Sequence, residues 1–128
     1  MSVASLFFRT AILIAIVGVV LGIFMGINQD FRLAHMHAHL NLLGWVSLFL
    51  FGGFYHLVPR AAEGVLPMVH YVLQVLGLAV FMFGLIGIAL DWPMDMVPFA
   101  AGGSLLVLAA FVIFGWIVFR TPLSRAAQ

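Results

Sequence analysis

This sequence has no cysteine and no lysine, and Asp, Glu, Lys and Arg together make up only 7% of its 128 residues. Without cysteine, disulfide bonds and thiolate metal sites are excluded, so any metal would be bound through nitrogen, oxygen or thioether sulfur. So few charged side chains cannot cover a water-facing surface when 66% of the residues are hydrophobic. We therefore predict an integral membrane protein in contact with the lipid bilayer. The net charge of +1 gives no reason to expect a nucleic-acid partner.

Long apolar runs cover roughly residues 6–27, 33–57, 67–90 and 97–119. Each run exceeds the roughly 20 residues that a membrane-spanning helix needs. The connecting segments are short, so consecutive helices must run antiparallel. The sequence thus predicts an all-α fold, in which residues 1–128 form one domain, an up-down bundle of four transmembrane helices.

The charged residues divide between the two ends of such a bundle. One end carries Arg9, Arg60, Arg120 and Arg125, and the other carries Asp30, Asp91 and Asp95 with Arg32. Arginine and lysine are enriched in cytoplasmic loops, so the arginine-rich end, with both termini, is predicted to be cytoplasmic. The bacterial inner (plasma) membrane is the expected location.

Three histidines, His35, His37 and His39, lie at the start of the second apolar run. Ionisable side chains in a membrane segment usually mark function, and imidazole is a good ligand for iron, copper and zinc. Residues two apart on a helix are turned by about 200°, so His37 points nearly opposite to the other two. These histidines are predicted metal or haem ligands, and the alternative is that they only bind water at the membrane interface. His56 and His70 belong to the other end, about 25 Å away, and cannot share the same metal.

Smaller features accompany the cluster. Gly18, Gly22 and Gly26 form a small-residue stripe on the first helix, which would let a neighbouring helix, or a flat macrocycle, approach closely. Three polar side chains within the apolar runs are expected to bond one another between helices; they are Asn41, Ser47 and Gln74.

The residues from His37 to Trp45 read H-A-H-L-N-L-L-G-W, and residues 54–60 read F-Y-H-L-V-P-R. This helix resembles the histidine-bearing tenth helix of subunit I in the haem-copper oxidase superfamily, closest to the cbb-type oxidases and the nitric oxide reductases. The likeness is strong over one helix, and the other three match only in hydropathy and position. It implies that His37 ligates a high-spin haem and His39 a low-spin haem b. His35 has no counterpart in the family pattern and is expected beside the haem.

This chain is much shorter than the family's subunit, and no other helix shows the histidine pattern that holds the family's active-site copper. The family's twelve helices form three arcs of four helices, so three copies of this chain could rebuild the ring. The resemblance therefore implies a homotrimer that binds haem at subunit interfaces and transfers electrons. In that case the chain would be an oxidoreductase component, with an electron donor and an electron acceptor that are unknown.

Arg32 lies one turn before the cluster, where its guanidinium would either pair with haem propionates or anchor the chain at the membrane surface. Met25, Met94 and Met96 are expected at the same end of the bundle. Because thioether and imidazole together suit Cu(I), a copper carrier or sensor is an alternative function. A third is an accessory subunit of a respiratory complex, in which the histidines ligate nothing.

Overall fold

The computed structural model describes residues 1–122, and every regular element in that range is helical. In chain order these elements are α1 (Val3–Asn28), α2 (Ala34–His39), a π-helical segment η1 (Leu40–Val46), α3 (Ser47–Leu57), a 3-10 turn η2 (Pro59–Ala62), α4 (Leu66–Ala89) and α5 (Val97–Arg120). Because α2, η1 and α3 follow one another without a break, they form one continuous helical rod, Ala34–Leu57, which we call the second rod or, for its three histidines, the histidine-bearing rod. The all-α prediction is confirmed for the described residues.

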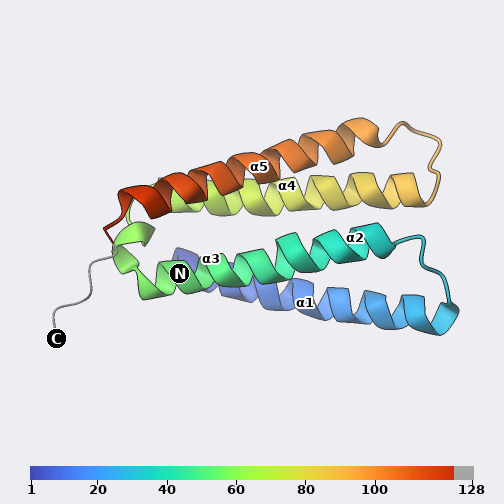
Figure 1. Cartoon of the computed structure of the whole chain (residues 1–128), viewed down its shortest axis with the longest axis horizontal. Helices are drawn as coiled ribbons and strands as arrows, with labels where there is room; N and C mark the ends of the chain where they lie inside the picture. Colours follow the sequence, from blue (N-terminus) through green and yellow to red (C-terminus); the bar gives the residue numbers. More distant parts are fainter. Residues whose placement is uncertain (123–128) are drawn as a thin grey trace.

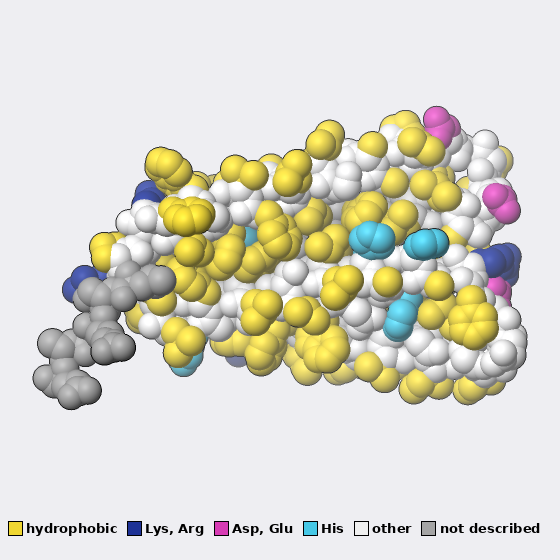
Figure 2. All heavy atoms as spheres, in the orientation of Figure 1, with side chains coloured by type: hydrophobic (Ala, Val, Ile, Leu, Met, Phe, Trp, Pro, Cys, Tyr) yellow, Lys and Arg dark blue, Asp and Glu magenta, His cyan; other side chains and the backbone are white. Residues whose placement is uncertain are grey.

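Four helices are long and apolar enough to cross a membrane: Val3–Asn28, Ala34–Leu57, Leu66–Ala89 and Val97–Arg120. Their limits lie within three residues of the predicted runs. Large apolar side chains face outward along them; Val19, Phe24 and Leu105, for example, are each more than half exposed. Figure 2 shows this apolar surface, with the charged side chains gathered near the two ends. Such a surface fits contact with lipid, as in an integral membrane protein.

Local signals explain where the helices begin and end. The Ser2 hydroxyl caps α1 by accepting a hydrogen bond from the Ser5 amide, and Gln29 ends it in the left-handed conformation at φ 52°. Pro67 and Pro98 lie in the first turns of α4 and α5, where proline's missing N–H has no cost. The short connections between these ends force adjacent helices to run antiparallel.

The antiparallel order brings the start of α1, the η2 turn and the end of α5 to one end of the molecule, which we call the terminal end (Figure 1). Arg9, Arg60 and Arg120 belong to it, and Arg125 lies outside the described residues. The opposite end, here the acidic end, holds the loops with Asp30, Asp91 and Asp95. The charge separation expected from the sequence is therefore present, and the cytoplasmic position of the terminal end stays a prediction.

The helices form two hairpins, α1 with the second rod and α4 with α5 (Figure 1). Glycine makes the α4–α5 contact especially close. A Cβ on Gly84 would overlap the backbone of Ala100, and one on Gly103 would overlap the backbone of Phe81. These helices thus pack backbone against backbone, which in a membrane replaces the hydrophobic drive available in water.

The two hairpins join at the terminal end through a cluster of aromatic rings, which we call the aromatic core. It consists of Phe7, Phe51, Phe54, Tyr55, Tyr71, Phe111 and Phe114 packed around His70. All four spans contribute to it. A smaller apolar cluster, Leu40 with Leu78 and Met82, joins the second rod to α4 nearer the acidic end.

Candidate functional site

The histidine cluster lies on α2, just after the loop that leaves α1. His35 is exposed, whereas His37 and His39 are each partly buried. Histidine side chains come to the surface in this half of the molecule, as Figure 2 shows. The cluster is thus reachable from outside the chain while its rings pack against neighbouring helices.

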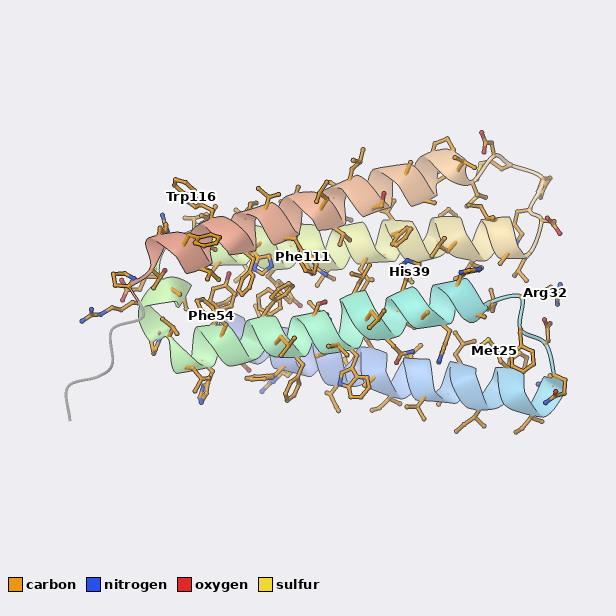
Figure 3. All side chains as sticks on the ribbon, viewed as in Figure 1. Met25, Arg32, His39, Phe54, Phe111 and Trp116 are labelled. Carbon is orange, nitrogen blue, oxygen red and sulfur yellow. The ribbon has the colours of Figure 1, made fainter. Side chains whose placement is uncertain are left out.

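His39 faces α4. Its ring meets the Phe81 ring edge-on, with the centroids 5.1 Å apart, and Figure 3 shows His39 between the second rod and α4. Its Nδ1 lies 2.8 Å from the carbonyl oxygen of His35, so Nδ1 carries the proton and donates it. In this tautomer Nε2 keeps its lone pair, and no hydrogen bond to Nε2 is formed among residues 1–122. That is the state in which an imidazole binds a metal.

His37 faces α1 instead. Its Cε1 lies 3.0 Å from the position that a Cβ on Gly22 would occupy, so glycine there makes room for the ring. The Asn41 side chain lies in the same way over Gly18 and donates a hydrogen bond to the His37 carbonyl oxygen at 2.8 Å. The predicted glycine stripe therefore receives one imidazole and one amide, while nothing lies within 4 Å of a Cβ on Gly26. As predicted, His37 and His39 point to different helices.

The π-helical segment η1 starts directly after His39 and was not foreseen. Here the Ser47 amide bonds the Leu42 carbonyl, five residues back, and the Ser47 hydroxyl bonds the same oxygen at 2.8 Å. Gln74 of α4 donates to the Leu43 carbonyl at 3.0 Å. In a π-helical turn the backbone bonds join residues five apart, and here side-chain donors add to them. π-helical turns often occur at functional sites.

The expectation that Asn41, Ser47 and Gln74 bond one another is wrong. Each of the three donates to a backbone carbonyl of the histidine-bearing rod instead. Each of these carbonyl oxygens lies within 3.0 Å of the side-chain atom that donates to it. All three amide or hydroxyl groups thus fix the backbone that presents the histidines.

Arg32 is engaged within its own loop. Its guanidinium forms two parallel hydrogen bonds to the Asp30 carboxylate, with Nη2 to Oδ2 at 2.6 Å and Nε to Oδ1 at 3.0 Å. The side-chain hydrogen bond from Arg32 lowers the pKa of Asp30 to about 2, and the pKa of Arg32 is raised in turn. Both side chains are substantially exposed, so the pair orders the loop more than it stabilises the fold.

The methionines take up different positions. Met25 and Met96 are buried, 5% and 3% exposed, and Met96 lies directly over Gly87 within the α4–α5 hairpin. Met94 is 52% exposed. In Figure 3, Met25 lies between α1 and the second rod. The two buried thioethers thus fill gaps between helices, which is the common use of methionine in cores.

His70 is the residue whose setting the sequence did not reveal. It is fully buried in the aromatic core, its Nδ1 lies 2.9 Å from the Tyr55 hydroxyl, and its ring stacks on Phe114. Its Nε2 and the Oε1 of the equally buried Gln74 have no hydrogen-bond partner within residues 1–122. A buried polar atom without a partner costs about 1–3 kcal/mol. The signal available in the sequence was a histidine and a glutamine four residues apart in an apolar span.

His56 lies apart from His70. It is exposed on α3, where its ring is near Phe8 at a centroid distance of 6.4 Å. More generally, within residues 1–122 no three His, Asp or Glu side chains come together as a group able to hold a metal ion. Within the cluster, His37 and His39 therefore contact different neighbouring helices, α1 and α4.

Comparisons of the chain with protein-family models, with curated proteins and with solved structures find no match. What the site can do therefore follows from its own geometry. It presents partly buried imidazoles at the edge of an apolar helix, one of them with a nitrogen lone pair available.

Proposed function

We propose that this chain is a membrane protein that binds haem b through His37 and His39 and transfers electrons. The observation that carries the proposal is the state of His39: its Nδ1–H is bonded to the His35 carbonyl, and its Nε2 is available at the edge of the helix. A ligating histidine typically has this arrangement, because the hydrogen bond at the other nitrogen fixes the tautomer and the ring orientation.

The residues around the two imidazoles fit a flat apolar cofactor. His37 and His39 lie against different helices, so they would bind two different irons. The surrounding surface is apolar and free of acidic side chains except at the loops. Bound haem would supply one-electron redox chemistry, and an iron with two imidazole ligands has no open position for a substrate. The role of this chain's residues is then to hold the group and to exclude water from it.

A homotrimer accounts for the ligand that each chain lacks. A low-spin haem needs two axial ligands, and the directions of His37 and His39 prevent both from binding one iron. The cluster of a neighbouring copy would supply the second ligand, and closed cyclic assembly is common in homo-oligomers. The likeness of this helix to the haem-copper oxidase subunit, with its three arcs of four helices, favours a trimer. The arginines at the terminal end favour a cytoplasmic position for that end, in a bacterial plasma membrane.

The copper alternative has less support. It needs thioether and imidazole donors that converge, whereas Met25 and Met96 are buried as packing groups. An accessory role without ligands leaves the free Nε2 of His39 unexplained.

The test is an optical spectrum of the purified protein and its variants. We expect a sharp Soret band that is lost or changed in His37→Ala and His39→Ala. The matched control is His56→Ala, because His56 is exposed and far from the cluster; His70 is a poor control, since its removal would disturb the core. Unchanged haem content in both cluster variants, or bound copper with no Soret band, would refute the proposal.

Assembly is tested separately by native mass spectrometry in detergent. We expect a haem-loaded trimer that dissociates when His37 or His39 is replaced. A haem-loaded monomer with a bis-histidine spectrum would refute shared ligation, and a stable dimer would refute the trimer alone.

A further inference from the structure

The strongest feature that the proposed function does not use is a line of buried polar groups between the hairpins. It contains Tyr55 of α3, His70 and Gln74 of α4, and the Leu43 carbonyl of η1. Tyr55 is 2% exposed, and both His70 and Gln74 are 0% exposed. Two of its atoms, His70 Nε2 and Gln74 Oε1, have no partner within the described chain.

The Tyr55 hydroxyl decides where the proton on His70 lies. This buried hydroxyl forms its one side-chain hydrogen bond within residues 1–122 with His70 Nδ1, so it satisfies its own proton by donating to that nitrogen. The neutral imidazole then carries its proton on Nε2, which becomes a donor in need of an acceptor. Gln74 uses its amide nitrogen to donate to the Leu43 carbonyl, so its buried Oε1 is an acceptor in need of a donor.

We infer that His70 and Gln74 hold one buried water molecule, which accepts from Nε2–H and donates to Oε1. Residues four apart on a helix are neighbours on the same face, with Cβ atoms about 5–6 Å apart, so one water can reach both side chains. Water also has the right capacity, since it accepts and donates at once. Buried waters typically satisfy polar groups of this kind that the protein leaves unpaired.

The water completes a continuous chain of hydrogen bonds from Tyr55 through His70, the water and Gln74 to Leu43. This hydrogen-bond chain connects α3, α4 and the π-helical segment, and it ends at Leu43, one turn beyond His39. It goes no further toward the acidic end, because the same face of α4 continues with Leu78 and Met82, which pack against Leu40. The hydrogen-bond chain therefore does not extend beyond these groups, and it holds the histidine-bearing rod to α4.

Magic-angle spinning NMR of the full chain in lipid bilayers, with ¹⁵N-labelled histidine, tests this directly. We expect the His70 ring to have a protonated Nε2 that receives magnetisation from water, although the ring is fully buried. The chain has five histidines, and the signal that disappears in His70→Phe identifies this one. A protonated Nε2 with no transfer from water would overturn the proposal.

A double-mutant cycle gives a second, independent readout. His70→Phe and Gln74→Leu each leave the water with one partner, whereas the double variant removes both, so its loss of melting temperature should be smaller than the sum of the single losses. The control pair is His70→Phe with Ser104→Ala, since Ser104 is exposed on α5 and bonds only within its own helix. That pair should be additive, and additivity of the His70 and Gln74 changes as well would contradict a shared water.

Discussion

His70 and His39 are the same residue type in opposite settings. His70 is enclosed by aromatic rings at the terminal end, with Phe51 and Phe114 ring centroids at 4.6 and 5.3 Å. His39 touches one ring, that of Phe81, and keeps one nitrogen open at the edge of its helix. The first setting holds helices together, and the second leaves an imidazole nitrogen without a hydrogen-bond partner in the described chain. The comparison teaches that the surroundings of a histidine in an apolar helix determine whether it serves packing or keeps a nitrogen available for binding.

The largest effect should come from removing the enclosed ring. His70→Ala leaves a cavity in the aromatic core and should lower the free energy of unfolding by about 2–4 kcal/mol, as for other large-to-small core changes. His35→Ala, at an exposed position, should change it by less than about 0.5 kcal/mol. Unfolding in mixed micelles measures both. Equal losses of unfolding free energy in the two variants would contradict the claim that the histidine at the terminal end is structural and that at the acidic end is not.

The next effect concerns how closely the α4–α5 hairpin packs. Gly84→Ala places a Cβ against the Ala100 backbone, which cannot move as a side chain can, so the helices must separate. We expect a loss of about 1–3 kcal/mol in unfolding free energy. Gly102→Ala is the matched control, because no atom lies within 4 Å of its Cβ. A loss in Gly102→Ala as large as that in Gly84→Ala would contradict the packing described.

A smaller and more local effect is expected beside the cluster. Gly22→Ala brings a methyl group to 3.0 Å from Cε1 of His37 and must turn or shift that ring. The free energy of unfolding should change by under about 1 kcal/mol. If His37 ligates haem as proposed, the absorption spectrum of the haem-loaded protein should change. Gly26→Ala, with open space above it, should leave the spectrum as it was. Identical spectra in the wild-type protein, Gly22→Ala and Gly26→Ala would mean that His37 does not contact the haem.

The sequence predicted the four spans well because length and hydropathy are sufficient to recognise them. It also predicted that His37 and His39 diverge, since the helical period determines this. It missed the π-helical turn after His39, because that turn depends on donors such as Gln74 that only the folded chain brings near. The hydrophobic pattern of residues 40–46 is the same as that of an ordinary α-helix, so it does not reveal the π-helical turn.

The role of His70 was beyond the sequence for a related reason. Its partners come from α1, α3 and α5, and nothing local to residues 66–89 indicates which rings will surround it. The pairing of Arg32 with Asp30 was predictable from the sequence, since the two residues are two apart in a short loop.

The smallest effect concerns this pair at the acidic end. Because Arg32 lowers the pKa of Asp30 from 3.8 to about 2, the contribution of the pair to stability is fully present above the unfolded pKa and is lost as the pH falls through about 2. Arg32→Gln should raise the pKa of Asp30 back toward 3.8, as measured by ¹³C NMR of its carboxyl group. A pKa that stays near 2 in this variant would refute the assigned cause. The ¹³C signal of Asp30 also tests whether the acidic end takes part in haem binding. If Arg32 turns to a haem propionate when haem binds, the Asp30 carboxylate loses its partner. The pKa of Asp30 must then rise in the wild-type protein as well.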